Sequence, residues 1–301
     1  MTEPNVWLNG RTMPASKASV RVFDLGIVLG ATVTEMTRTF RHTPFRLADH
    51  VARLYRSMKY AYIEPPCSAD ELIQHTMELI EHNTKMIGPE DDLGIVHFVT
   101  AGENPIYGDT LPGREGCTAC IHSFRLPFKE WRHMFTDGVH VVTPSIRHVP
   151  PACLDAKIKN RSRLHWHVAD KQTQAVDPRA VTLLLDLDAN ITECAGSNFV
   201  ILRDETICTP TDRNILHGMS LTTLEDLADR ADLGYVAQDL QLYDVIQADE
   251  AWLPSTPYCI APCTRVNTLP IGDGQPGPRW RRMMDVWSNH VGMDILAQLL
   301  A

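Results

Sequence analysis

The sequence has no uninterrupted apolar run that approaches about 18 residues, the length a membrane-spanning helix needs. Its first residues, MTEPNVWLNGRTMP, lack a basic segment followed by an apolar stretch, so we expect no secretory signal. Lys and Arg number 28 against 37 Asp and Glu, and the formal charge of −9 disfavours nucleic acid and membranes as partners. We therefore expect a cytoplasmic protein, in which a local positive site for a small anion is still possible.

Common catalytic and metal signatures are also absent. The sequence contains no GxGxxG, GxxxxGK[ST], HExxH or GxSxG motif, which argues against the commonest nucleotide, zinc-protease and hydrolase sites. Among eight cysteines, Cys117 and Cys120 form a CxxC pair inside an apolar segment, and no histidine follows at zinc-finger spacing. We predict buried free thiols and no metal site.

The length of 301 residues favours two domains. Apolar residues recur at helical spacing over 47–63 and 68–87, and Ser68 with Glu71 forms a capping-box pattern at the start of the second segment. Strand-like segments follow at 93–102 and 117–126. These elements predict an N-terminal α+β domain over residues 1–122.

A polar stretch that contains PFKEWRHMFTDG predicts an interdomain linker over 123–137, followed by a C-terminal domain over 138–301. In that domain the segments GVHVVTPSI, AVTLLLDL, SNFVILRD and EAWLPSTP are strand-like. Helices are expected over 220–234, ended by Gly234 as a C-cap, and over 277–300.

Four short segments could together form a cofactor site. ILHGMSLTT places a glycine before a helix, whose free N–H groups bind phosphate, and LPSTPY adds two hydroxyls. ITECAGSNFV offers the carboxylate of Glu193, which can hold a pyridine nitrogen protonated, and LDAKIKN offers lysines for a Schiff base. Phosphate cradle, carboxylate and lysine are the parts of a site for pyridoxal 5'-phosphate.

Nearly the whole chain resembles the class IV, or fold-type IV, pyridoxal-phosphate aminotransferases. The motifs WLNGR, DLGIVLGATVTEMTRTF, RLADHVARLYRS, Lys-Asn, ITECAGSNFVIL, ILHGMSLTTL, EAWLPSTPYCIAP and IGDGQPGP occur in the order of that family. The family includes branched-chain and D-amino acid aminotransferases, (R)-amine transaminases and aminodeoxychorismate lyases. The resemblance implies an α+β fold with a small N-terminal α/β domain and a larger C-terminal pseudo-barrel, and a homodimer.

The resemblance also assigns roles to individual residues. Arg53 matches the arginine that grips the cofactor phosphate, and Glu193 matches the carboxylate on the pyridine nitrogen. The lysine that forms the Schiff base also moves the proton as general base and acid, so ping-pong kinetics are implied. The other implied cofactor-binding residues are Gly196, Ser197, Asn198, Leu216, Gly218, Met219, Ser220, Ser255 and Thr256.

Two lysines compete for the role of nucleophile. Family members place the lysine slightly over thirty residues before the glutamate; Lys159 lies 193 − 159 = 34 residues before Glu193, and Lys157 lies 36. The Lys-Asn dipeptide favours Lys159, whereas an Asp-x-Lys-x-x-Asn pattern fits Lys157. In an extended segment both would point the same way, so we prefer Lys159 and keep Lys157 as the rival.

Substrate recognition follows no known signature of the family. The strand GIVHFVTAG lacks the Tyr-x-Arg of branched-chain enzymes and the arginine of D-amino acid enzymes. Weaker substrate candidates are Arg38, Thr100 and Pro257, and Arg38 could instead form a structural ion pair with Glu35 or another acid. We expect a branched-chain-like aminotransferase acting on an amino acid and a 2-oxo acid. The alternatives are a D-amino acid or (R)-amine transaminase, or a lyase of the same fold.

Overall fold

The computed structural model describes residues 3–108 and 115–301, which form two compact units. Unit 1 comprises residues 1–126 and 158–162, and unit 2 comprises 127–157 and 163–301. The segment expected to be a linker holds the end of a strand and helix α5 (Phe128–Thr136), which belongs to unit 2. No helix in the described ranges is long and apolar enough to cross a membrane.

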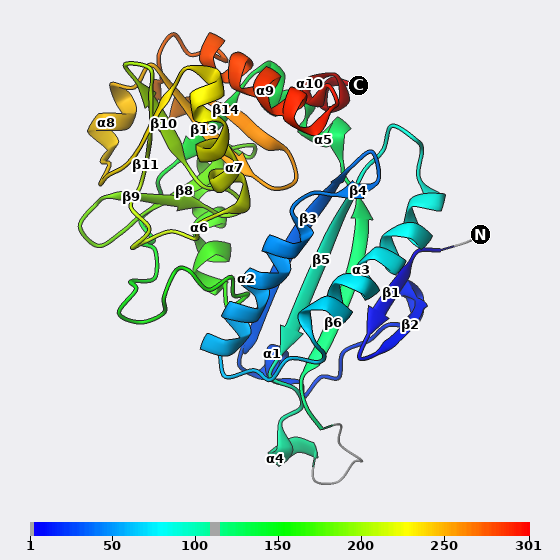
Figure 1. Cartoon of the computed structure of the whole chain (residues 1–301). Helices are drawn as coiled ribbons and strands as arrows, with labels where there is room; N and C mark the ends of the chain where they lie inside the picture. Colours follow the sequence, from blue (N-terminus) through cyan, green and yellow to red (C-terminus); the bar gives the residue numbers. More distant parts are fainter. Residues whose placement is uncertain (1–2, 109–114) are drawn as a thin grey trace. The chain divides into compact units, whose positions relative to one another are not determined.

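Unit 1 is built on a six-stranded sheet in the order β2-β1-β6-β5-β3-β4. Its strands are β1 (Asn5–Leu8), β2 (Arg11–Pro14), β3 (Thr32–Phe40), β4 (Thr43–Pro44), β5 (Leu93–Thr100) and β6 (Thr118–Arg125). The two long helices α2 (Leu47–Tyr60) and α3 (Ala69–Asn83) pack against this sheet (Figure 1). Short helices complete the unit: α1 (Leu25–Val28), α4 (Pro105–Gly108), η1 (Ala15–Lys17) and η2 (Thr84–Met86).

The helical period of the sequence explains α2 and α3. Leu54 and Met58, one turn apart on α2, are fully buried, and Leu72 and Leu79 fill the same role on α3. The predicted capping box is confirmed, since Ser68 Oγ accepts the Glu71 N–H while the Glu71 carboxylate accepts the Ser68 N–H.

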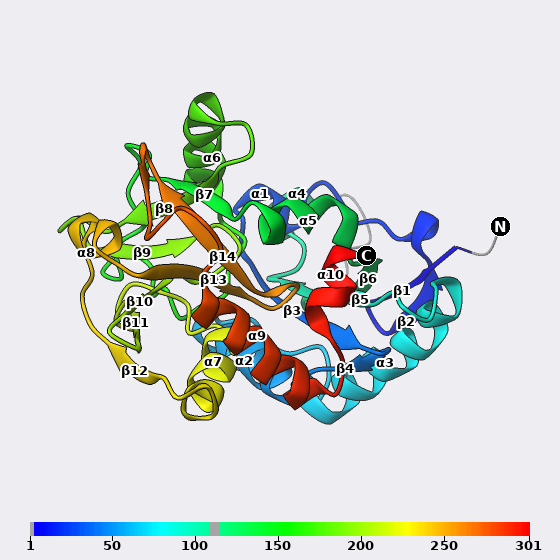
Figure 2. The same ribbon diagram turned by 90° about the horizontal axis from the view of Figure 1, so that it is seen from above.

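Unit 2 contains a larger mixed sheet in the order β12-β11-β10-β13-β14-β7-β8-β9, with β15 paired to β14. Its strands are β7 (Val139–Val142), β8 (Val181–Leu185), β9 (Ile191–Cys194), β10 (Val200–Arg203), β11 (Thr206–Thr209), β12 (Gly234–Ala237), β13 (Glu250–Ser255), β14 (Cys259–Val266) and β15 (Leu269–Pro270). Besides α5, its helices are α6 (Leu164–Val176), α7 (Met219–Ala228), η3 (Asp229–Ala231), α8 (Leu242–Ile246), α9 (Pro278–Val291) and α10 (Ile295–Leu300). Both α7 and α9 contact β13, and the two helices contact each other (Figure 2).

Two predicted helix ends were wrong. Helix α7 stops at Ala228, a single 3₁₀ turn follows, and Asp232 rather than Gly234 takes the left-handed position (φ 47°), so Gly234 is free to begin β12. The helix expected over 277–300 is two helices, because Gly292 adopts φ 71° as the C-cap of α9 and Asp294 caps α10 anew.

Candidate active site

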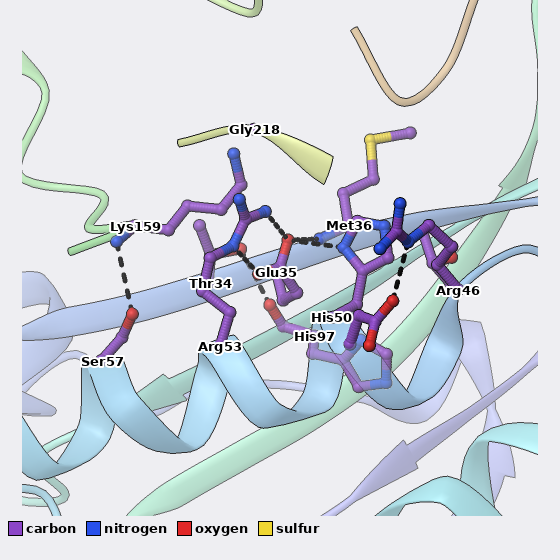
Figure 3. A network of polar contacts seen from close by, with 12 residues as sticks. Thr34, Glu35, Met36, Arg46, His50, Arg53, Ser57, His97, Lys159 and Gly218 are labelled. Carbon is purple, nitrogen blue, oxygen red and sulfur yellow. Dashed lines mark hydrogen bonds and ion pairs between the residues drawn. The ribbon is translucent and has the colours of Figure 1, made fainter. Parts of the chain in front are cut away.

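Lys159 lies in a segment of unit 1 that pairs with the first residues of β3. The Lys159 carbonyl accepts the Thr34 N–H at 2.8 Å, the Arg161 N–H donates to the Thr32 carbonyl at 3.2 Å, and Asn160 bridges Val33. The Lys159 N–H also donates to Ser57 Oγ on α2 at 3.4 Å (Figure 3). These bonds fix the backbone of Lys159 on both sides, so its amine leaves from a defined point on the sheet edge.

Lys157 has a different backbone environment. Its N–H donates to Asp155 Oδ1 at 2.9 Å, which closes a turn, and its exposed ammonium lies 3.8 Å from the Asp155 carboxylate. The expectation that both lysines share one extended segment was therefore wrong, because Lys157 lies in a turn that the Asp155 side chain closes. Of the two, only Lys159 is held by a strand.

Arg53 belongs to a buried charged cluster with Glu35 of β3 and His50 of α2. Arg53 donates from Nε to Glu35 Oε2 at 2.7 Å and from Nη2 to Oε1 at 2.8 Å (Figure 3). The Glu35 carboxylate also lies 3.0 Å from His50 Nδ1 and accepts the Met36 N–H at 2.9 Å. Two side-chain groups and one backbone amide thus hold a single carboxylate, and this carboxylate fixes the Arg53 guanidinium.

The charges in this cluster follow from their burial. Burial raises the pKa of the Glu35 carboxyl, but the charge of Arg53 and the contact with His50 outweigh it and hold that pKa well below its usual range. Burial also lowers the pKa of His50, and Glu35 only partly reverses this effect. Glu35 is therefore ionised and paired with the Arg53 cation, and neutral His50 donates from Nδ1 to the carboxylate.

The sequence did not reveal the correct partners of these arginines. Arg38, a weaker substrate candidate, is only 1% exposed, has Asp92 at 3.6 Å and lies 4.0 Å above the Phe40 ring. The ion pair expected between Arg38 and either Glu35 or another acid is therefore formed with Asp92. The alternation of side chains along β3 could have predicted the Glu35 cluster. Glu35 lies two residues after Val33, so both side chains point to the side of the sheet that α2 covers.

Unit 2 brings the remaining cofactor candidates together from three segments. Glu193 Oε2, at the end of β9, accepts the Leu216 N–H at 3.0 Å, and Asn198 donates its amide to the Leu216 carbonyl at 2.7 Å and to Glu193 at 3.3 Å. The third segment joins through Ser255, whose hydroxyl donates to the Gly196 carbonyl at 2.6 Å. Asn198 thus links the carboxylate to the turn that precedes α7.

The turn before α7 has the features of an anion cradle. Gly218 is the N-cap of this ten-residue helix, and no side chain in the described ranges caps it, so the N–H groups of Met219 and Ser220 in the first turn are left for a ligand. A Cβ at Gly218 would collide with Asn198 Oδ1. Glycine is therefore required for the helix to start beside Asn198.

The remaining candidates of unit 2 have simpler surroundings. Ser197 and Asn198 are buried in the turn after β9, and the Asn198 N–H donates to the Pro254 carbonyl at 2.9 Å. Thr256 and Pro257 form the half-buried turn between β13 and β14. In unit 1, Thr100 at the end of β5 is buried and accepts the Gly102 N–H at 3.1 Å.

The residues present fit pyridoxal phosphate on two observations. The Glu193 carboxylate is oriented through Oε2, while among the described residues Oε1 has His148 Nε2 at 3.7 Å as its one polar neighbour, so this oxygen can accept a proton donor such as a pyridinium. The uncapped start of α7 provides N–H groups for a phosphate. The sequence did not single out His148, which is buried beside Trp166.

The eight cysteines all carry free thiols. Cys120 lies within β6 and Cys117 directly precedes that strand, and burial raises the pKa of Cys120 to about 12. Such a thiol is not a nucleophile at neutral pH. In the described ranges no three His, Cys, Asp or Glu side chains are grouped so that they could hold a metal ion.

The family model described as Amino-transferase class IV matches residues 32–266. A D-alanine aminotransferase of Bacillus licheniformis is 28% identical over 95% of this chain and 96% of its own length. A putative branched-chain-amino-acid aminotransferase of Methanocaldococcus jannaschii is 27% identical over 93% and 94%. The branched-chain amino acid aminotransferase of Escherichia coli shares the fold, with a TM-score of 0.85 at 21% identity over 97% of this chain and 94% of that one.

Proposed function

Because the chain belongs to the class IV aminotransferases, enzymes that use pyridoxal 5'-phosphate, we propose that it transfers the amino group of a branched-chain amino acid to a 2-oxo acid. The observation that supports this substrate is the face of the unit 1 sheet opposite α2 and α3. Strand register places Met36, Val96 and Phe98 on that face, with Phe124 beside them. Lys159 is opposite Thr34 and has its parity, so the lysine lies at the border of this apolar face.

Gly94 leaves room on this apolar face for two larger side chains. A Cβ at Gly94 would lie 2.6 Å from the Phe124 ring and 2.9 Å from the Met36 methyl group, so these two side chains fill the space above the glycine. A wall of Met and Phe suits an aliphatic substrate side chain and offers nothing to a charged one.

Each candidate residue has a role in this proposal. The cofactor, when bound, supplies the electron sink for the substrate carbanion. The Lys159 amine would hold the cofactor covalently, and it would accept and return the exchanged proton as base and then as acid. Glu193 would keep the pyridine nitrogen protonated, and the start of α7 would bind the phosphate, a role that the family resemblance also assigns to Arg53.

The two half-reactions share one lysine and one cofactor, so the proposed kinetics are ping-pong. We also propose a homodimer, as the family resemblance implies, and a cytoplasmic location. The location is supported by the eight free thiols, which a reducing compartment preserves.

The test combines a substrate panel with two lysine variants. Purified enzyme is mixed with L- and D-leucine, L- and D-alanine and (R)- and (S)-amines, and loss of the cofactor absorbance band is recorded. The proposal expects conversion by L-leucine with release of its 2-oxo acid. Lys159→Ala should lose the band, and Lys157→Ala, the matched control from the exposed turn, should keep it. Retention of the band in Lys159→Ala would transfer the role to Lys157.

A second candidate is D-amino acid transamination, which the 28% identity to a D-alanine aminotransferase favours. Faster conversion by D-alanine than by L-leucine would establish it. Release of pyruvate from a chorismate-derived substrate alone would instead identify a lyase.

A further inference from the structure

A pair of side chains, the Arg161 guanidinium and the neutral His122 imidazole, lies on the same sheet face as Lys159. Arg161 and Lys159 flank Asn160 in the segment that pairs with β3, and Asn160 is opposite Val33, on the helix-covered side. In an extended segment the residues i and i+2 point the same way, so Lys159 and Arg161 both extend toward the side of Thr32 and Thr34. Arg161 is therefore oriented toward the face where the substrate is expected.

His122 of β6 is the second member of the pair. Strand register aligns His122 with Val96 and Met36 on this face, and its ring lies 6.4 Å from the Phe98 ring. Burial lowers the pKa of His122, and the positive charge of Arg161 lowers it further, which shows that the guanidinium is near the imidazole. Partial burial also lowers the pKa of Arg161 itself.

In the described part of the chain no carboxylate forms an ion pair with Arg161 or His122. Arg161 has no ion pair or side-chain hydrogen bond with any described residue, whereas Arg38 and Arg53 of the same unit each have a buried carboxylate partner. On β3, β5 and β6 none of the residues that share the sheet face is acidic, and the nearby Asp24 carboxylate accepts hydrogen bonds from Thr118 and from the Gly26 N–H and has no ion pair with Arg161. Arg161 is exposed to solvent, and a guanidinium without a counter-ion beside an apolar sheet face is open to an incoming anion.

We propose that Arg161 binds the carboxylate of the amino acid and 2-oxo acid substrates and, with His122 beside it, provides the recognition that the family's usual strand signatures do not supply in this chain. The inference rests on the proposed function, because it takes the face around Lys159 as the substrate side. The apolar wall of Met36 and Phe98 then receives the substrate side chain, and the guanidinium provides a planar pair of donors for the carboxylate. Arg161 is thus a specificity-determining residue.

The experiment compares an acid with its uncharged analogue. 4-Methylvaleric acid is leucine without its amino group, and 4-methylvaleramide replaces the carboxylate by an amide. Calorimetric titration of the holoenzyme should give tighter binding of the acid by roughly 100-fold, the effect of charge-assisted hydrogen bonds to one carboxylate. Arg161→Gln should remove most of this preference, and Arg161→Lys should keep part of it because the charge is retained.

The matched control is Arg125→Gln. Arg125 belongs to the same sheet but has the opposite parity to His122, and its exposed guanidinium pairs with Asp91 at 2.9 Å. This variant should bind acid and amide as the unchanged enzyme does. Equal binding of acid and amide by the unchanged enzyme, or a full acid preference in Arg161→Gln, would overturn the proposal.

A measurement on the unchanged protein covers the case in which the variants do not fold. The imidazole signal of His122 is followed by NMR as a function of pH, with and without 4-methylvaleric acid. A carboxylate on Arg161 offsets its positive charge, so the pKa of His122 should rise on binding; an unchanged pKa counts against the site. Failure of the proposed function is separate, since it would appear as a lack of conversion of leucine by an enzyme that still discriminates acid from amide.

Discussion

Replacement of Glu35 by Gln tests whether the buried carboxylate is the anchor of Arg53. The Glu35 side chain is fully buried and accepts four hydrogen bonds, two of them from Arg53. Glutamine has nearly the same shape, but only one of its two terminal atoms can accept a hydrogen bond. The best orientation places the amide oxygen at the position of Oε1, which receives three donors, and the amide nitrogen then opposes the Nε–H of Arg53.

The magnitude follows from that geometry. The substitution removes a charge-assisted hydrogen bond and leaves the Arg53 cation, in a residue only 5% exposed, without its counter-ion. Breaking a buried ion pair by removing one partner costs about 3–5 kcal/mol. We expect a loss of this size in the free energy of unfolding, together with weaker cofactor binding because the guanidinium is no longer held.

The assay is equilibrium urea unfolding at pH 7, followed by circular dichroism. Glu81→Gln is the control, since the Glu81 side chain of α3 forms an exposed ion pair with Lys85 of η2 and its loss should cost less than about 1 kcal/mol. The double variant Glu35→Gln with Arg53→Gln should be more stable than Glu35→Gln alone, because no unpaired charge is left in the core. A cost for Glu35→Gln as small as that of the control would refute the reasoning.

Two further predictions concern pH and the cofactor turn. Burial lowers the pKa of His97 to about 4, so below about pH 6.5 the unfolded chain binds a proton that the folded chain does not. Stability should therefore fall between about pH 6.5 and 4, by about 3 kcal/mol for this one group, and His97→Gln should flatten that part of a urea-midpoint profile. Gly218→Ala should weaken cofactor binding by roughly 10-fold or more, measured by dialysis and absorbance, because the added methyl group displaces Asn198 from Glu193. Gly196→Ala, where a Cβ meets no described atom within 4 Å, should unfold at the same urea concentration as the unchanged protein, and a lower midpoint would show that this turn is as tight as the one at Gly218.

Local signals in the sequence were sufficient for many elements of the fold. The capping box at Ser68 and the apolar period of α2 and α3 each depend on residues within one or two turns of helix, and these elements formed as predicted. Helix ends were less accessible. Both Asp232 and Gly234 could end α7, and the choice depends on Gly234 entering β12 beside β11, which is a long-range contact.

The ordered motifs were enough to identify the family and to nominate Lys159, Glu193 and Gly218, because a cofactor fixes both residue type and order along the chain. Only the tertiary structure showed that Glu35 and His50 orient Arg53, since ion-pair partners on different elements carry no fixed spacing. The register between strands is also a long-range property, and it placed Arg161 and His122 on the same face of the sheet. The sequence by itself determined which chemistry the chain carries, and the pairing of distant segments decided which charges meet.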